Sequence, residues 1–216
     1  SPMPAPGGGT KMLVIEYDVG PGAYGVAQAG DGAVWTSLPE RGALARVGPD
    51  GQVSRVPLDA GPSRPMVLAP GPDGALWCTL NHANAIARIT PAGGVTTYPL
   101  PTAGAAPVGI HAGPESVWFA EIGAGQIGRI FPDGRIDEFP LPDRSGRPHA
   151  VVATADGGCW ATLWAASAAI RLDRDRRPAE VASFRPGAEP HGIALGRDGF
   201  VWVALEAGTL AGLAAG

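Results

Sequence analysis

Five tryptophans recur at near-constant spacing along this chain, and this period constrains the fold more than any other feature. The successive intervals are 42, 41, 42 and 42 residues, between Trp35, Trp77, Trp118, Trp160 and Trp202. Each tryptophan follows a Gly- or Pro-marked segment and a turn that is often written Asp-Gly. A repeat of this length made of short strands is typical of a β-propeller blade. The simplest role of the five tryptophans is therefore packing between blades.

The repeats predict five blades of four antiparallel strands each. The third repeat shows the pattern most fully, with expected strands at residues 108–110, 116–121, 126–130 and 135–140. Turns such as Pro-Asp-Gly at 49–51 and 132–134 separate alternating apolar segments, which indicates antiparallel hairpins.

The final repeat ends after its third expected strand, 209–213, so a fourth strand must come from elsewhere. Residues 12–17 (MLVIEY) precede the first blade and resemble the outer strand at 95–98. An N-terminal strand that completed the last blade would close the ring and remove an exposed edge. We therefore predict one all-β domain over residues 11–216, a five-bladed β-propeller closed by this strand. Residues 1–10 are expected to be a disordered or added segment.

Composition narrows the function classes. Of 216 residues, 33 are Gly and 23 are Pro, and they recur at turns in register with the repeat, as in a turn-rich all-β fold. The net charge of -4 gives no electrostatic footprint for nucleic acid or an anionic membrane. No apolar run is long enough to span a bilayer, and no signal-peptide pattern opens the chain. Cys78 and Cys159 stand in non-adjacent repeats, so we expect free thiols and a cytoplasmic monomer.

Two glutamates in the last repeat are expected to face each other. If the hairpin pairs symmetrically about the turn at 196–199, Glu189 lies directly opposite Glu206. Like charges at such positions are destabilising, so the pair requires a cation between them or a shifted proton. Carboxylate oxygens suit a hard divalent ion such as Mg²⁺.

Two histidines occupy equivalent sites in neighbouring repeats. His191 is two residues after Glu189, hence on the same side of the strand, and His149 is 42 residues before His191. Both are expected to point toward one end of the propeller, near its axis. Glu121 ends the tryptophan strand of the third repeat and could line the same mouth.

Structural interpretations stand beside these functional ones. A glutamate at a strand end is usually a solvated rim residue, and a lone histidine is usually a satisfied polar group. We favour that interpretation for His82 and His111. No nucleophile elbow, phosphate-binding glycine loop or Cys-rich zinc spacing is present.

At these residues the chain resembles the streptogramin B lyases (virginiamycin B lyase family). The matching phrases are RPHA at 147–150, EPHG at 189–192, WVALE at 202–206, and WFAE at 118–121 followed by QIGRI at 126–130. The likeness covers nearly all of the chain beyond the first ten residues. The two His-containing phrases are fairly specific, whereas the blade pattern is shared by unrelated propellers. The family normally has seven blades, so about two middle blades are missing here.

The resemblance implies a Mg²⁺-dependent lyase that opens a cyclic depsipeptide antibiotic by β-elimination. It implies that His191 accepts the proton, that Glu189 and Glu206 bind the metal, and that His149 contacts substrate. Trp164 takes the place of Glu206 in the preceding repeat, where it could offer an aromatic wall to substrate or simply pack. The alternatives are a non-catalytic binding propeller, and a metal-dependent enzyme that acts on another small ester or lactone.

Overall fold

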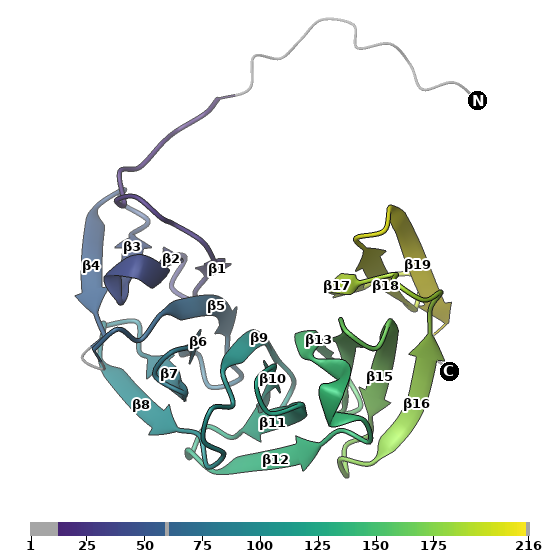
Figure 1. Cartoon of the computed structure of the whole chain (residues 1–216). Helices are drawn as coiled ribbons and strands as arrows, with labels where there is room; N and C mark the ends of the chain where they lie inside the picture. Colours follow the sequence, from purple (N-terminus) through teal and green to yellow (C-terminus); the bar gives the residue numbers. More distant parts are fainter. Residues whose placement is uncertain (1–12, 59–60, 215–216) are drawn as a thin grey trace, which may run out of the picture.

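Five antiparallel β-sheets stand side by side around an open arc (Figure 1). The computed structural model describes residues 13–58 and 61–214. The inner strands β1, β5, β9, β13 and β17 line the concave side of the arc, and β4, β8, β12 and β16 lie on its convex side. This order, strand by strand outward from the centre, is the blade arrangement that the repeat predicts. No helix in the described part of the chain is long and apolar enough to cross a membrane.

Each sheet is a meander of consecutive strands. The first sheet consists of β1 (Val26–Gln28), β2 (Val34–Leu38), β3 (Ala43–Val47) and β4 (Val53–Pro57). The second consists of β5 (Pro65–Pro70), β6 (Leu76–Leu80), β7 (Ala85–Ile89) and β8 (Val95–Pro99). The third consists of β9 (Pro107–Ala112), β10 (Val117–Glu121), β11 (Gln126–Ile130) and β12 (Ile136–Pro140).

The fourth sheet consists of β13 (Pro148–Ala153), β14 (Cys159–Leu163), β15 (Ala168–Leu172) and β16 (Pro178–Ser183). The last has three strands, β17 (Pro190–Leu195), β18 (Phe200–Leu205) and β19 (Thr209–Ala214). Two short 3₁₀ helices, Pro39–Arg41 and Arg144–Gly146, lie in connections.

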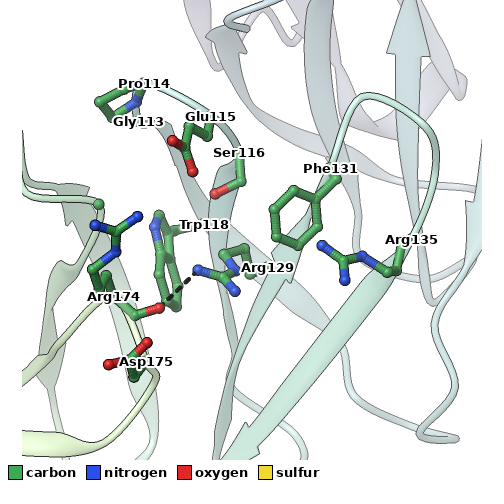
Figure 2. Close-up of a pocket in the computed structure, with 11 residues that line it drawn as sticks. Gly113, Pro114, Glu115, Ser116, Trp118, Arg129, Phe131, Arg135, Arg174 and Asp175 are labelled. Carbon is green, nitrogen blue, oxygen red and sulfur yellow. Dashed lines mark hydrogen bonds between the residues drawn. The ribbon is translucent and has the colours of Figure 1, made fainter.

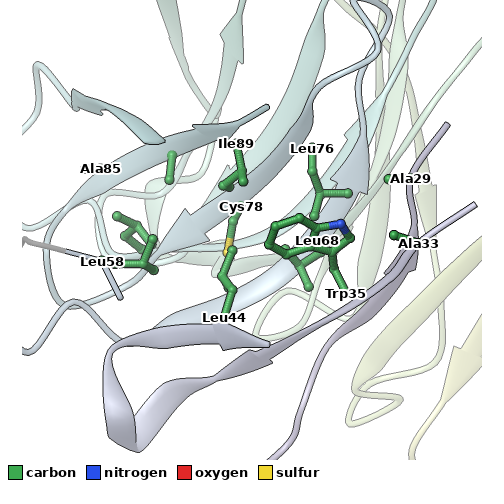
Figure 3. Close-up of a cluster of buried hydrophobic side chains, with 12 residues drawn as sticks. Ala29, Ala33, Trp35, Leu44, Leu58, Leu68, Leu76, Cys78, Ala85 and Ile89 are labelled. Atoms are coloured by element: carbon green, nitrogen blue, oxygen red, sulfur yellow. The ribbon is translucent and has the colours of Figure 1, made fainter. Parts of the chain in front are cut away.

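The core lies between neighbouring sheets. Trp35 of the first sheet packs in one apolar cluster with Leu76 and Cys78 of the second (Figure 3). Trp77 packs in the same way with Phe119 of the third sheet. The prediction of inter-blade packing is therefore confirmed for these tryptophans. Trp202 stays half-buried, since no sheet follows the last one in the described chain.

The predicted closing strand is wrong for the residues that the structure describes. Residues 13–17 form no strand, and β19 has no fourth strand beside it. Instead the N-terminal segment runs along the first sheet, where the Arg55 Nε donates to the Val19 carbonyl at 3.3 Å. With five sheets, the two ends of the arc stay apart (Figure 1), so this segment cannot follow the first sheet and also reach β19. Residues 1–10 and Met12 lie outside the described residues.

Cys78 and Cys159 are free and buried, as expected. Burial raises the pKa of the Cys78 thiol to about 12, which makes it unreactive near neutral pH.

Candidate functional site

His149 and His191 meet on the concave side of the arc. Each is the second residue of an inner strand, β13 and β17 respectively, and directly follows a proline. The centroids of their rings are 3.9 Å apart, with 38° between the ring planes. The period of 42 residues thus predicts their equivalence correctly, and the arc brings the two rings into contact.

The backbone just before each histidine adopts a conformation that recurs in four of the five sheets. The residue before the first proline of the inner strand adopts a left-handed φ in four sheets, at Arg64, Ala106, Arg147 and Glu189 (φ 49°, 50°, 52° and 51°). A register shift then follows, between Pro148 and Val151 in β13 and between Pro190 and Ile193 in β17. Such a bulge re-aims the side chains inside it. All four positions share the left-handed φ. The strained backbone of Glu189 is therefore a general feature of this fold and does not by itself indicate a functional site.

A buried hydroxyl ties the two histidine strands together. Thr162 Oγ1 donates to the His191 carbonyl at 2.9 Å and accepts from the Ala150 N–H at 3.0 Å. Ala150 directly follows His149, so one side chain fixes both bulges. Sequence reasoning missed Thr162, although Ser37 and Thr79 recur at the same place in the repeat and bridge the first three sheets alike.

Glu189 and Glu206 are opposed, as predicted, although a bulge and not the assumed symmetric pairing brings them opposite each other. Pro190 pairs with Leu205, and the Glu206 N–H donates to the Glu189 carbonyl at 3.1 Å. One Glu206 oxygen, Oε1, lies 3.8 Å from His191 Nε2. The two glutamates therefore stand on adjacent, hydrogen-bonded backbone segments beside the histidine pair.

The donor chemistry at this point fits a hard cation with few protein ligands. Among the described residues no group of three or more His, Cys, Asp or Glu side chains is placed to hold a metal. Mg²⁺ is commonly bound through one or two carboxylates, with water and substrate completing its shell. Glu189 and Glu206 are the residues that could serve in this way.

Burial and neighbouring charge set the protonation of His149. Burial lowers the pKa of His149 below its ordinary value, and the neighbouring His191 lowers it further, whereas Glu206 opposes the shift. His149 is therefore neutral near pH 7, which allows it to accept a hydrogen bond. A small hollow of about 210 Å³ lies beside both rings, and it is also lined by Tyr24, Val108 and Ile110. The hollow is largely apolar and faces the centre of the arc.

Glu121 does not line this hollow, contrary to the sequence-based expectation. Its side chain is fully buried within the third sheet, where the Gln126 amide donates to it. The pKa of Glu121 is raised to about 8, mainly by burial. The other four repeats have Leu38, Leu80, Leu163 and Leu205 at this position, so the period itself signals a core position.

The remaining candidates lie outside the hollow. Trp164 follows β14, half-buried, and its backbone N–H donates to the Arg147 carbonyl at 3.1 Å. It is not among the residues that line the hollow. His111 Nδ1 accepts from the Ala153 N–H at 3.0 Å, which is the satisfied polar group that we expected. His82 lies in the turn between β6 and β7.

The fold and the site together define a propeller-like all-β protein with a histidine pair and two carboxylates at the inner ends of its last two sheets. The Virginiamycin B lyase family matches residues 6–213, and the chain belongs to this family.

Solved structures agree with this assignment. The chain is 34% identical to virginiamycin B lyase from Staphylococcus aureus, with a TM-score of 0.87 over 94% of this chain and 71% of that one. It is 33% identical to a catalytically inactive variant of that enzyme solved with quinupristin, with a TM-score of 0.80 over 87% of this chain and 64% of that one. Among curated relatives, virginiamycin B lyase from Bordetella pertussis is 39% identical over 61 residues, 27% of this chain and 20% of the relative. The chain thus matches about a fifth of that relative and about two thirds of the solved lyases.

Proposed function

We propose that this protein is a carbon–oxygen lyase that opens the ester linkage of cyclic streptogramin B antibiotics. The observation that supports the proposal best is the contact between the rings of His149 and His191 beside Glu206, in a chain of the virginiamycin B lyase family. A relative of this chain was solved with quinupristin, which supports a substrate of this class.

The reaction is a β-elimination. The imidazole of His191 takes the proton from the carbon α to a substrate carbonyl, the electrons of that C–H bond form a carbon–carbon double bond, and the bond from the β carbon to the ester oxygen breaks. The leaving group is a carboxylate, so the ring opens without water. A neutral histidine is suited to this step near pH 7.

The other residues of the site have supporting roles in this proposal. The Glu206 carboxylate, 3.8 Å from His191 Nε2, stabilises the positive charge that His191 gains with the proton. His149, kept neutral by burial, orients the substrate by hydrogen bonding. Glu189 and Glu206 would hold Mg²⁺, which when bound acts as a Lewis acid toward negative charge on the substrate.

The decisive experiment replaces the base. His191→Ala should lower the rate of quinupristin opening by about 10²–10⁴-fold, as expected for loss of a general base. The assay incubates protein, Mg²⁺ and quinupristin and follows the product by mass spectrometry. His82→Ala is the matched control, because His82 is exposed in the turn between β6 and β7 and does not line the hollow, and it should leave the rate unchanged. Full activity in His191→Ala would refute the assignment.

The product mass separates the rival functions. A linear product of unchanged mass indicates elimination, and a gain of one water indicates hydrolysis of an ester. An unchanged cyclic compound that nevertheless binds would favour a non-catalytic binding propeller. The open arc favours that second candidate, because this chain covers 64% of the quinupristin-bound relative and has fewer surfaces to enclose a bulky ring.

A further inference from the structure

One turn of the third sheet is a residue shorter than its counterpart in the second sheet. Between β5 and β6 the turn reads Gly71-Pro72-Asp73-Gly74-Ala75 and is closed by a hydrogen bond from the Gly71 N–H to the Ala75 carbonyl. Between β9 and β10 it reads Gly113-Pro114-Glu115-Ser116 and is closed from the Gly113 N–H to the Ser116 carbonyl. The shorter turn moves the acidic residue relative to the tryptophan that follows.

In the second sheet the aspartate of this turn is clamped by two donors. Trp77 Nε1 donates to Asp73 Oδ1 at 3.1 Å, and Arg88 Nε donates to Asp73 Oδ2 at 2.7 Å. The first and fourth sheets keep the ion pair, from Arg46 to Asp31 at 2.9 Å and from Arg171 to Asp156 at 2.6 Å. An ion pair between the aspartate of this turn and the arginine of the third strand thus recurs in the first, second and fourth sheets.

The third sheet keeps both donors, but its turn places no carboxylate on them; Arg129 instead pairs through Nη2 with Asp137 of β12 at 3.5 Å and donates from Nη1 to the Arg174 carbonyl at 3.2 Å. Trp118 Nε1 and Arg129 Nε are buried without a hydrogen-bond partner among the residues that the structure describes. In the first sheet the equivalent two atoms are also unpaired, but there Asp31 still pairs with another nitrogen of its arginine. Glu115, the acid of the short turn, is exposed and makes no ion pair with any described residue. Buried donors without partners cost about 1–3 kcal/mol each, so this arrangement favours an added acceptor.

A hollow of about 250 Å³ lies where the aspartate would be (Figure 2). Three guanidinium groups gather around it, those of Arg129, Arg135 and Arg174. Two acids also line it, Glu115 and Asp175, but Asp175 already pairs with Arg177 at 3.1 Å. Arg129 likewise pairs with Asp137, which leaves Arg135 and Arg174 against Glu115 as the charged side chains of the hollow without an ion pair to a described residue.

We propose that this hollow binds a small carboxylate, which takes the place of the aspartate that the turn lacks. Planar guanidinium groups recognise carboxylates through paired hydrogen bonds, and the volume suits a molecule of few heavy atoms. The hollow lies at the opposite end of the inner strands from the histidine pair, because it follows the end of β9 whereas His149 and His191 stand at the starts of β13 and β17. The site is thus independent of the lyase proposal.

The test uses the indole N–H signals of ¹⁵N-labelled protein, titrated with sodium acetate at constant ionic strength held by sodium chloride. The Trp118 signal should shift and saturate in roughly the millimolar range, as suits a ligand of four heavy atoms. The Trp77 signal is the internal control and should stay fixed, because Asp73 already occupies its site. The proposal would be overturned if the Trp118 signal stayed fixed. It would also be overturned if the Trp118 and Trp77 signals moved together without saturating.

Three variants sharpen the result. Glu115→Asp with one glycine inserted after it copies the turn of the second sheet and should abolish the acetate response, since the chain then supplies its own carboxylate. Arg174→Gln, at an exposed turn, should weaken acetate binding about three- to tenfold without affecting the fold. Asp73→Ala should create an acetate response at Trp77. An unchanged response in the graft and in Arg174→Gln would show that acetate acts elsewhere.

Discussion

A single hydroxyl connects the backbones that carry the two histidines. Thr162 Oγ1 bonds to backbone groups of both bulges, so its loss leaves the Ala150 N–H and the His191 carbonyl without their partner. Thr162→Val keeps the shape of the side chain and should destabilise the protein by about 1–3 kcal/mol. It should also shift the ring signals of both histidines in ¹H–¹³C spectra, because the bulges are free to move apart.

Thr79→Val is the matched control for this prediction. Thr79 makes the same bridge one junction earlier, to the Val67 N–H at 3.2 Å and the Val108 carbonyl at 2.7 Å. Its loss should cost similar stability and shift the histidine signals much less than Thr162→Val does, because Val67 and Val108 line the hollow but do not carry the rings. Thr162→Ser should restore the signals. Identical histidine spectra in both valine variants would mean that Thr162 only supports the fold.

Glu121 makes the stability depend on pH. Burial raises its pKa in the folded state to about 8, above the ordinary value of 4.5. Between these values the folded state binds more protons than the unfolded state, so the free energy of unfolding falls as pH rises from about 4.5 to 8. Glu121→Gln keeps the shape of the side chain but does not titrate. The free energy of unfolding of this variant, compared with that of the native protein at the same pH, should therefore increase as the pH rises.

Urea denaturation at pH 5 and pH 8.5 measures the effect. The exposed glutamate Glu16 gives the control, and Glu16→Gln should show the same pH dependence as the native protein. A Glu121→Gln variant that loses stability equally at both pH values would contradict the protonated state that we assign to Glu121.

The start of each inner strand is the element that shapes the site. At Ala106 the left-handed φ of 50° strains an alanine, since Cβ crowds the following carbonyl. Ala106→Gly should relieve this strain and stabilise the protein by about 0.5–1 kcal/mol. The neighbouring Ala105 is buried with no positive φ, so Ala105→Gly should destabilise by about 1 kcal/mol. Thermal unfolding of the two variants compares them, and a loss of stability in both would refute the strain.

The period predicts the strands and their partners because these depend on local patterns. It places His149 and His191 at equivalent sites. Glu189 and Glu206 are opposed as predicted, but the assumed symmetric register is wrong by one residue next to the turn, and the bulge between Pro190 and Ile193 compensates for this shift. The period does not predict the bulge after Pro190, nor the left-handed φ before it, because neither follows from the alternation of apolar residues along one strand. The bridge by Thr162 was missed for the same reason, since its two partners lie on different inner strands.

Closure is the part of the fold that sequence patterns could not decide. An apolar segment at 12–17 suits a strand, but pairing with β19 also requires the ends of the arc to meet. Its apolar side chains from residue 13 onward remain exposed, as in Leu13 (82%) and Ile15 (61%). Leu210 on β19 is likewise 65% exposed. The two surfaces that closure would join are thus both uncovered in this structure.

This asymmetry predicts a gradient of local stability across the whole molecule. Every residue of β10 is buried, because its sheet has a neighbour on both sides. In β18 the burial alternates, and in β19 no residue is buried, because the last sheet has a neighbour on one side only. Stability in stacked repeats is close to a sum of unit and interface contributions. The first sheet also has one neighbour, but the last sheet has one strand fewer as well, so it should open most readily.

Amide hydrogen exchange followed by mass spectrometry checks this gradient within one sample. Peptides from β18 and β19 should exchange on the order of tenfold faster or more than peptides from β10 and β11. β10 and β11 serve as the internal control, since both their faces contact other sheets. Equal protection of β18–β19 and β10–β11 would contradict the open arc, because an amide on an uncovered sheet at the end of a repeat array has no second interface to slow its opening. Dilution of the same sample would then show what protects the last sheet. Protection by a second copy of the chain weakens on dilution, whereas protection by the chain's own residues does not.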